Sequence, residues 1–296
     1  MSGPEESVVL AGIDGSASAR NAAVWAAEEA DRRSAVLRLV QAYLIPSPGI
    51  TGPFVAGVRS GFQGQAEEWL DEAEAAVRER WPAARIERVV AEGNPVAVLL
   101  GESRGAELAV LGSRGLGGFT GLLVGSTAVA LAAHAPCPVV VVRGRMPDDV
   151  PPATGPVVVG LDGAADSDEA LEFACAAAAA RKTSLTVVRT WNELSPDGTL
   201  RSMEIVPDEV AAGERCRIEG QLALWREKYP ELRIDVEIVR GRPVRTLLEY
   251  GESARLVVVG SRGRGGFAGM LLGSTSQALL AHSTCPVAVV RPRSQP

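Results

Sequence analysis

Cysteine, histidine, lysine and aromatic residues are all scarce in this chain of 296 residues. Its four cysteines are too few for a disulfide scaffold, and no two of them form the C-x-x-C pair typical of zinc or thioredoxin chemistry. Aromatic residues make up only 4%, so the core has to be built from Val, Leu and Ala. The 36 acidic residues outnumber the 30 basic ones, and without a basic block neither nucleic acid nor an anionic membrane is an expected partner.

Several binding motifs are also missing. Lys182 and Lys228 are the only lysines, and neither follows Gly-x4-Gly, which excludes a Walker A phosphate loop. The turn after the first expected strand lacks Gly-x-Gly-x-x-Gly, which excludes the dinucleotide fingerprint. His134 and His282 each stand three residues before a cysteine, but such a pair lacks two ligands of a structural zinc site. We expect both histidines near helix C-termini and no metal held by side chains.

Neither a secretion signal nor a membrane span is expected. The first seven residues are acidic and lack the basic-then-apolar order of a signal peptide. Two long stretches carry no charged residue, Leu116–Val142 and Gly265–Val290, but glycines interrupt one end of each and prolines the other. Only about ten helical residues remain uninterrupted, which favours a buried helix over a membrane span. The chain is therefore expected to be cytoplasmic.

The chain repeats itself at an offset of 148 residues. The 16-residue segment that begins at Gly112 matches the one that begins at Gly260 at 12 positions. The same offset pairs Asp14 with Asp162, Gly93 with Gly241, Pro95 with Pro243, His134 with His282, and Cys137 with Cys285. One register without a net insertion indicates a tandem duplication of a domain. We predict a first domain at residues 1–146, a linker at 147–155 and a second domain at 156–296.

Within each copy, apolar runs of strand length alternate with longer helical patterns. The strands read as continuous Val and Leu runs, so both faces of a sheet should be covered. This alternation predicts an α/β fold class, two tandem five-stranded parallel doubly wound sandwiches. The expected strands are Ser7–Ile13, Val36–Ala42, Ile86–Val90, Leu108–Gly112, Pro138–Arg143, Pro156–Leu161, Leu185–Thr190, Asp235–Val239, Leu256–Gly260 and Pro286–Arg291. The expected helices of the first copy are Ser18–Arg33, Gln63–Arg80, Pro95–Arg104 and Ser126–His134.

Two helix starts are also predicted. Asn94 before Pro95 is typical of an N-cap followed by proline in the first turn. Asp166 with Glu169 three residues later resembles a capping box.

An aspartate follows the first strand of each copy, Asp14 in one and Asp162 in the other. Open parallel sheets bind ligands beyond the carboxyl ends of their strands. An aspartate there is either a turn former or a partner for a ribose hydroxyl, and its place at this edge favours the ribose.

A glycine-rich segment follows the fourth strand of each copy and leads into the last helix. Its glycines remove Cβ atoms and let successive N–H groups turn inward as an anion nest. Gly-Ser-Thr opens the last helix, whose free N–H groups and positive dipole end favour phosphate, and nearby arginines can approach the charge. One such loop is also what a tight βα connection requires, but two copies ending in Gly-Ser-Thr favour a phosphate site in each half.

The spacing Gly-x2-Gly-x9-Gly-Ser/Thr, which begins at Gly112 and again at Gly260, resembles the ATP-binding signature of universal stress proteins. The resemblance covers nearly the whole chain, one family domain per half, as in tandem-domain members from actinobacteria. It implies an adenine-nucleotide alpha hydrolase-like sandwich that binds ATP, with or without Mg²⁺. The residues expected around ATP are Gly12, Asp14, Val40, Gly112, Ser113, Arg114, Gly115, Gly117, Gly118, Gly125, Ser126, Thr127, Gly160, Asp162, Val188, Gly260, Ser261, Arg262, Gly263, Arg264, Gly265, Gly266, Gly273, Ser274 and Thr275.

By similarity, the two aspartates would lie against the adenosine, Val40 and Val188 would offer main-chain contacts to adenine, and the glycine segments would wrap the triphosphate. Family members act in stress adaptation through nucleotide-linked regulation and often dimerise. The resemblance therefore implies a homodimeric regulator with one ATP per domain, whose protein partner the residues do not identify.

Two other functions stay open. A slow ATPase or phosphotransferase would share the site but needs an orienting base and metal ligands, and Asp14 and Asp162 are the only evident carboxylates there. An interaction module with one vestigial site is the third alternative. Ser16 of the first copy aligns with Ala164 of the second, so the two loops are not expected to bind a ligand alike.

Overall fold

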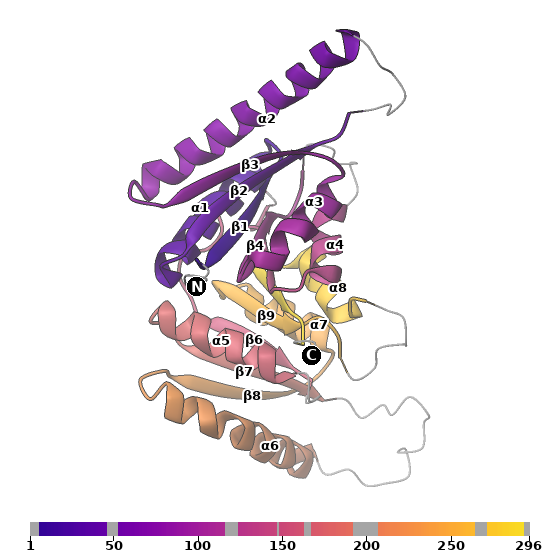
Figure 1. Cartoon of the computed structure of the whole chain (residues 1–296). Helices are drawn as coiled ribbons and strands as arrows, with labels where there is room; N and C mark the ends of the chain where they lie inside the picture. The colour runs from indigo at the N-terminus through magenta and orange to yellow at the C-terminus, as the bar shows by residue number, and fades with distance from the viewer. Residues whose placement is uncertain are drawn as a thin grey trace, which may run out of the picture. The chain divides into compact units, whose positions relative to one another are not determined.

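A computed structural model of the chain (Figure 1) describes residues 6–45, 53–115, 124–146, 148–162, 167–191, 207–263 and 271–292. The chain divides into two compact units, Met1–Pro151 and Pro152–Pro296. The first unit contains β1 (Val8–Ile13), α1 (Ala17–Arg33), β2 (Val36–Tyr43), α2 (Pro53–Arg80), β3 (Ile86–Glu92), α3 (Pro95–Glu102), the 3-10 turn η1 (Ser103–Gly105), β4 (Leu108–Gly112), α4 (Ser126–His134) and β5 (Val139–Val142). The second contains β6 (Val157–Leu161), α5 (Asp168–Ala180), β7 (Leu185–Trp191), α6 (Pro207–Lys228), β8 (Ile234–Arg240), α7 (Pro243–Gly251), β9 (Leu256–Gly260), α8 (Ser274–His282) and β10 (Val287–Val290).

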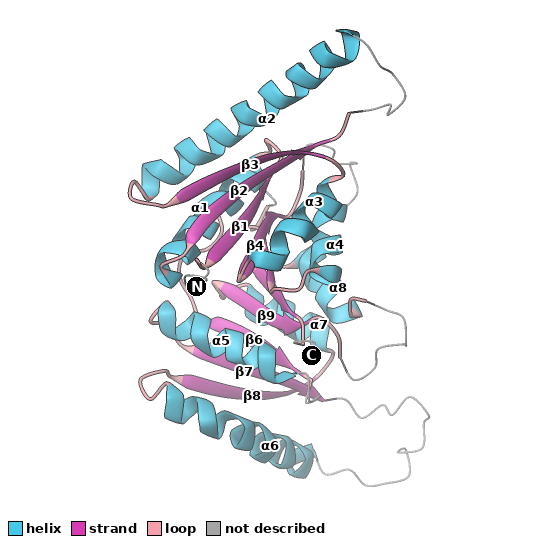
Figure 2. Ribbon diagram, viewed as in Figure 1, coloured by secondary structure: helices cyan, strands magenta, loops and turns pink. Residues whose placement is uncertain are grey.

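Each unit is built on five parallel strands, drawn in magenta in Figure 2. The strand order is β3-β2-β1-β4-β5 in the first unit and β8-β7-β6-β9-β10 in the second. The order reverses between β1 and β4, and between β6 and β9, so the loops after these strands diverge and leave a crevice. In the first unit α1 contacts α2, and α3 contacts α4. In the second unit α5 contacts α6, and α7 contacts α8. This architecture confirms the predicted α/β, doubly wound fold class.

The ten predicted strands are confirmed, with bounds that differ by no more than two residues. Strands β1, β5 and β10 are buried at every residue, as continuous apolar runs in a covered sheet require. The expectation that both faces are covered is wrong for β3, whose residues are half-buried or exposed. This strand ends the order of its unit, and its sequence Ile-Glu-Arg-Val-Val-Ala-Glu carries three charges that an edge strand can expose to water.

The predictions of where helices begin have mixed outcomes. Asn94 caps α3 as predicted, because its Oδ1 accepts hydrogen bonds from Val96 N at 3.0 Å and Ala97 N at 3.3 Å. Asp166 lies outside the described residues, so the capping box stays a prediction, and Ser167 directly precedes α5. Helix α2 begins at Pro53 and not at Gln63, so the predicted start is wrong by ten residues.

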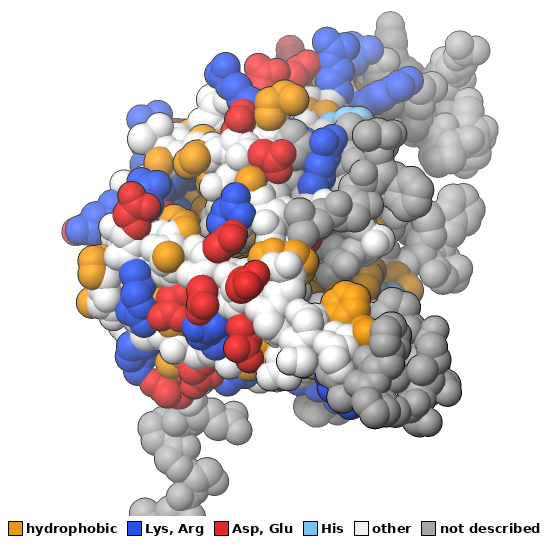
Figure 3. Space-filling model, turned by 90° about the horizontal axis from the view of Figure 1, so that it is seen from above, with side chains coloured by type: hydrophobic (Ala, Val, Ile, Leu, Met, Phe, Trp, Pro, Cys, Tyr) orange, Lys and Arg blue, Asp and Glu red, His pale blue; other side chains and the backbone are white. Residues whose placement is uncertain are grey.

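The described surface mixes charges of both signs. Figure 3 shows acidic and basic side chains interspersed on the face it presents. Several of them form ion pairs one turn apart, such as Arg78 with Glu74 and Arg245 with Glu249, both at 2.8 Å. No helix among the described residues is long and apolar enough to cross a bilayer.

Candidate functional site

Each unit has a pocket at the carboxyl ends of its strands, beside the reversal in strand order. The volumes are about 420 Å³ in the first unit and about 390 Å³ in the second. Both lie within the range of roughly 300 to 1,000 Å³ that small-molecule sites occupy. Of the predicted site residues, those that line the first pocket are Gly12, Asp14, Val40, Gly112, Arg114, Gly115, Gly125, Ser126 and Thr127. Those that line the second are Gly160, Asp162, Val188, Gly260, Arg262, Gly263, Gly273, Ser274 and Thr275.

Seven predicted residues are not among those that line the pockets. Ser113 and Ser261 are fully buried beside the pockets, and their contribution is made through the main chain. The other five lie outside the described residues, so their place in the structure stays a prediction. They are Gly117, Gly118, Arg264, Gly265 and Gly266.

Main-chain hydrogen bonds bring the two ends of each glycine segment together. The N–H of Gly125 donates to the carbonyl of Ser113 at 2.8 Å, and the N–H of Gly273 donates to that of Ser261 at 2.7 Å. Ser113 and Ser261 also donate their own N–H groups to the last strand of their unit, to Val142 and Val290. The end of β4 or β9 is therefore held next to the start of the last helix, which places both at one pocket.

Helices α4 and α8 begin without a side-chain cap from their N-cap residues. Gly125 and Gly273 are these N-cap residues, and neither makes a side-chain cap hydrogen bond. A helix N-terminus has unsatisfied N–H groups and a positive dipole end, which together favour an anion. Because these residues line the pockets, each pocket offers such donors at one end.

Asp14 is held in place by the residue that starts α1. Ser16 donates to the Asp14 Oδ1 atom from its N–H at 3.0 Å and from its Oγ at 2.7 Å. The same Oγ accepts the N–H of Ala19 and thereby caps α1, and it lies 3.2 Å from the carbonyl of Arg114 on the facing loop. Ser16 thus links the loops after β1 and β4 across the crevice.

Gly115 and Gly263, the second glycine of each motif, let the aspartate carboxylates approach the main chain. A Cβ at Gly115 would overlap Asp14 Oδ2, and a Cβ at Gly263 would lie 2.8 Å from Asp162 Oδ2. Any other residue type would therefore displace the carboxylate of its own pocket. Gly112 is required by α1, because a Cβ there would lie 2.7 Å from the main chain of Ser18.

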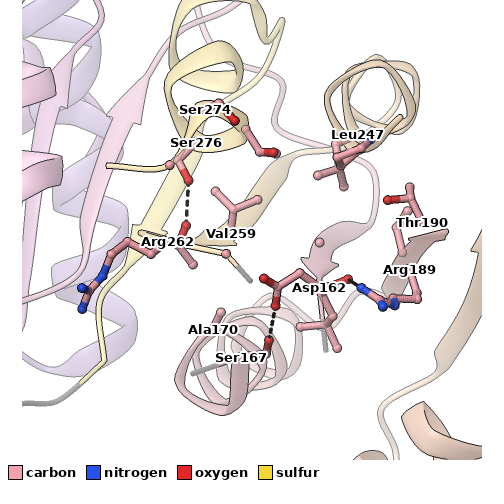
Figure 4. A pocket seen from close by; sticks show the side chains of 18 of the residues that line it. Asp162, Ser167, Ala170, Arg189, Thr190, Leu247, Val259, Arg262, Ser274 and Ser276 are labelled. Carbon is pink, nitrogen blue, oxygen red and sulfur yellow. Dashed lines mark hydrogen bonds between the residues drawn. The ribbon is translucent and has the colours of Figure 1, made fainter. Parts of the chain in front are cut away.

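The second pocket holds its aspartate differently, as Figure 4 shows. Asp162 accepts a hydrogen bond of 2.9 Å from the hydroxyl of Ser167, at the start of α5. Ser167 stands where the first copy has Ala19, and Ala164, which aligns with Ser16, lies outside the described residues. A hydroxyl from another position thus holds the aspartate of the second copy, which the alignment of the repeats does not reveal.

The end of β7 contributes Arg189, Thr190 and Trp191 to the lining of the second pocket, and none of these three residues was predicted. The Nε atom of Arg189 pairs with Glu214 of α6 at 2.8 Å, and its Nη1 atom donates to the carbonyl of Leu161 at 3.4 Å. Alignment of the two copies could have drawn attention to these residues, because Arg189 and Thr190 replace Gln41 and Ala42 of the first copy.

A serine in a nucleophile-elbow pattern and the two histidines could suggest catalytic or metal chemistry, but their positions in the fold have structural explanations. Ser103 is the centre of a Gly-x-Ser-x-Gly segment, the pattern of a nucleophile elbow, but it is fully buried in η1 and donates to Leu100 O at 2.8 Å. His134 and His282 end α4 and α8, as predicted. Burial raises the pKa of the Cys137 thiol to about 11, so this cysteine is protonated and unreactive at neutral pH.

The fold and the pockets together define a doubly wound α/β protein with a ligand-sized site at the strand ends of each unit. Residues 7–143 and 154–291 each match the universal stress protein family. The chain belongs to this family, with two of its domains in tandem.

Related proteins of similar length support this assignment. The chain is 35% identical over 296 residues to universal stress protein Rv2623 of Mycobacterium tuberculosis, covering 96% of both chains. It is 32% identical over 293 residues to a universal stress protein of Mycolicibacterium smegmatis, covering 96% of this chain and 97% of that one. A crystal structure of a universal stress protein from Archaeoglobus fulgidus covers 97% of this chain and 98% of its own, with a TM-score of 0.67 and 21% identity, and supports the fold.

Proposed function

We propose that the chain binds ATP in the pocket of each unit and acts as a nucleotide-dependent regulator in stress adaptation. The observation that carries this proposal is the repeated arrangement in each pocket of an aspartate, a glycine-rich strand end and a helix N-terminus without a side-chain cap. Family membership supports it, because the predicted ATP signature lies on these elements in both units.

The lining of the first pocket combines the three kinds of group that a nucleotide requires. Val40, Leu99 and Pro95 are apolar lining residues that suit a purine base. Asp14 is a hydrogen-bond acceptor for ribose hydroxyls. The start of α4, with the hydroxyls of Ser126 and Thr127, supplies donors for phosphate oxygens.

Binding is favoured over hydrolysis by the small number of carboxylates. Asp14 and Asp162 are the only acidic residues among the described linings of the two pockets. Phosphoryl transfer needs groups that hold Mg²⁺ as well as a group that orients the attacking hydroxyl or water. One aspartate per pocket, already bonded to a serine, does not supply both.

Extraction of nucleotide from the purified protein tests the proposal. Acid-quenched protein should release an adenine nucleotide that chromatography identifies, and the emptied protein should rebind ATP in a calorimeter. Steady-state release of phosphate should stay well below about 1 s⁻¹, the low end for kinases. If the protein releases no adenine nucleotide and binds none, the proposed function is wrong.

A further inference from the structure

The two pockets differ at the end of the second strand of each unit, beside the aspartate that the proposed function assigns to the ribose. Arg189 and Thr190 line the second pocket, where the first copy has Gln41 and Ala42. Ala42 lines the first pocket, whereas Gln41 is buried and is not among the residues that line it. The second pocket therefore gains a cation and a hydroxyl that the first lacks.

The guanidinium of Arg189 lies next to Leu161, the residue that precedes Asp162. Figure 4 shows it pointing from β7 back toward Asp162, and its Nη1 atom lies 3.4 Å from the carbonyl of the preceding residue, Leu161. The side chain is 12% exposed, so solvent screens its charge less than that of a surface arginine. The salt bridge to Glu214 sets the direction of the guanidinium.

Arg189 shares Glu214 with a second arginine. Arg217 lies 3.3 Å from the other carboxylate oxygen of Glu214. The first unit has Ala66 in place of Glu214 and Trp69 in place of Arg217. Trp69 packs on the loop after β1, where a Cβ at residue 15 would lie 2.5 Å from the indole ring. Where the first unit has the indole ring of Trp69 against this loop, the second unit has Arg189 and Arg217 paired with Glu214.

We propose that the second pocket selects an adenine nucleotide that carries a phosphate on a ribose hydroxyl, and that Arg189 binds this phosphate. The inference rests on the proposed function, in which Asp162 marks the ribose. In dinucleotide-binding sites an acidic residue recognises free ribose hydroxyls, and a nearby arginine accommodates a ribose phosphate. A guanidinium matches phosphate geometry with paired donors, which glutamine at position 41 does not provide. The first pocket is accordingly a site for a nucleotide with free ribose hydroxyls.

Calorimetry on the full-length chain with one pocket blocked tests this selectivity. Gly125→Glu places a carboxylate in the first pocket and leaves the second to be measured. AMP is compared with adenosine 2′,5′-bisphosphate and adenosine 3′,5′-bisphosphate, which add only a ribose phosphate and differ in its position. At least one bisphosphate should bind about tenfold or more tightly than AMP, since an arginine–phosphate contact is charge-assisted. In the Gly273→Glu variant only the first pocket is open, and the ratio of its affinities for a bisphosphate and for AMP should be near one.

Two variants in the Gly125→Glu background assign the effect. Arg189→Gln installs the residue of the first copy and should bring the ratio toward one. Glu214→Gln breaks the same salt bridge but keeps the arginine, so it should retain the preference, and thermal unfolding checks that both variants fold. AMP binding without a bisphosphate preference, or a preference that survives Arg189→Gln, overturns this inference and leaves the proposed function standing. Binding of no adenine nucleotide overturns both.

Discussion

At the scale of single residues, the glycines of each pocket are required for two different reasons. At Gly115 and Gly263 a Cβ would collide with the carboxylate of the neighbouring aspartate and force that side chain to move. At Gly125 and Gly273 a Cβ would not collide, since the nearest atoms to it would lie at 3.7 Å and 3.4 Å. Both line their pockets, so these two glycines keep space for a ligand.

This distinction predicts the outcome of substituting Gly125 and Gly273. Gly125→Glu or Gly273→Glu places a negative charge where the phosphates should lie, and each should weaken ATP binding in its own unit by at least about a hundredfold. Gly64→Glu on the exposed part of α2 is the matched control, because a Cβ there meets nothing within 4 Å. Calorimetry would contradict the proposed site if both pocket variants bound ATP as tightly as the control.

Two buried thiols are expected to lower the stability of the folded chain at alkaline pH. Burial raises the pKa of Cys137 to about 11 and that of Cys175 to about 12. In the unfolded chain the pKa of a thiol is about 8.5. Above that pH the unfolded state binds fewer protons than the folded state. The free energy of unfolding therefore falls as the pH rises toward the folded pKa values. Urea unfolding at pH 7.5 and pH 10 should show this loss. The loss should be smaller in a Cys137→Ala, Cys175→Ala variant, and an equal loss in both proteins would refute the assignment.

The site is only partly predictable from the residues. Asp14, Asp162 and the Gly-Ser-Thr segments can be found because the repeat marks them twice at strand ends. Ser167 and Arg189 escape prediction because they reach their pocket from a helix start and a neighbouring strand, and neither position repeats. Side chains that converge only after the sheet has formed leave no local pattern.

At the scale of elements, strands are easier to predict than helix ends. Continuous Val and Leu runs mark strands that the sheet buries, and all ten strands are confirmed. The predicted start of α2 is wrong because Gly57 and Gly61 have low helix propensity and yet lie within the helix. The exposure of β3 becomes evident only from the strand order, which places its charged residues at an edge.

Helices α3 and α7 offer a test of capping within one chain. Asn94 caps α3, whereas Arg242 holds the same position before α7 and makes no side-chain cap. Asn94→Ala should lower the free energy of unfolding by about 1 kcal/mol, and Arg242→Asn should raise it by a similar amount, because the new side chain can accept the free N–H groups. Urea unfolding measures both. Destabilisation by Arg242→Asn would contradict the argument.

At the scale of the whole molecule, one domain sequence occurs twice and carries two similar pockets. The duplication is evident from the repeat, and the fold of each unit follows from it. The differences between the copies are less evident, because they consist of single replacements such as Gln41 by Arg189 whose meaning depends on neighbours in space. On the proposed function, the two sites are predicted to bind related adenine nucleotides that differ at the ribose.

The binding stoichiometry of ATP tests the central claim most directly. Calorimetric titration of nucleotide-free, full-length protein should give two ATP per chain, and the Gly125→Glu variant should give one. A chain with both Gly125→Glu and Gly273→Glu should bind none. A wild-type stoichiometry of zero, or two sites that persist in the double variant, would contradict the account.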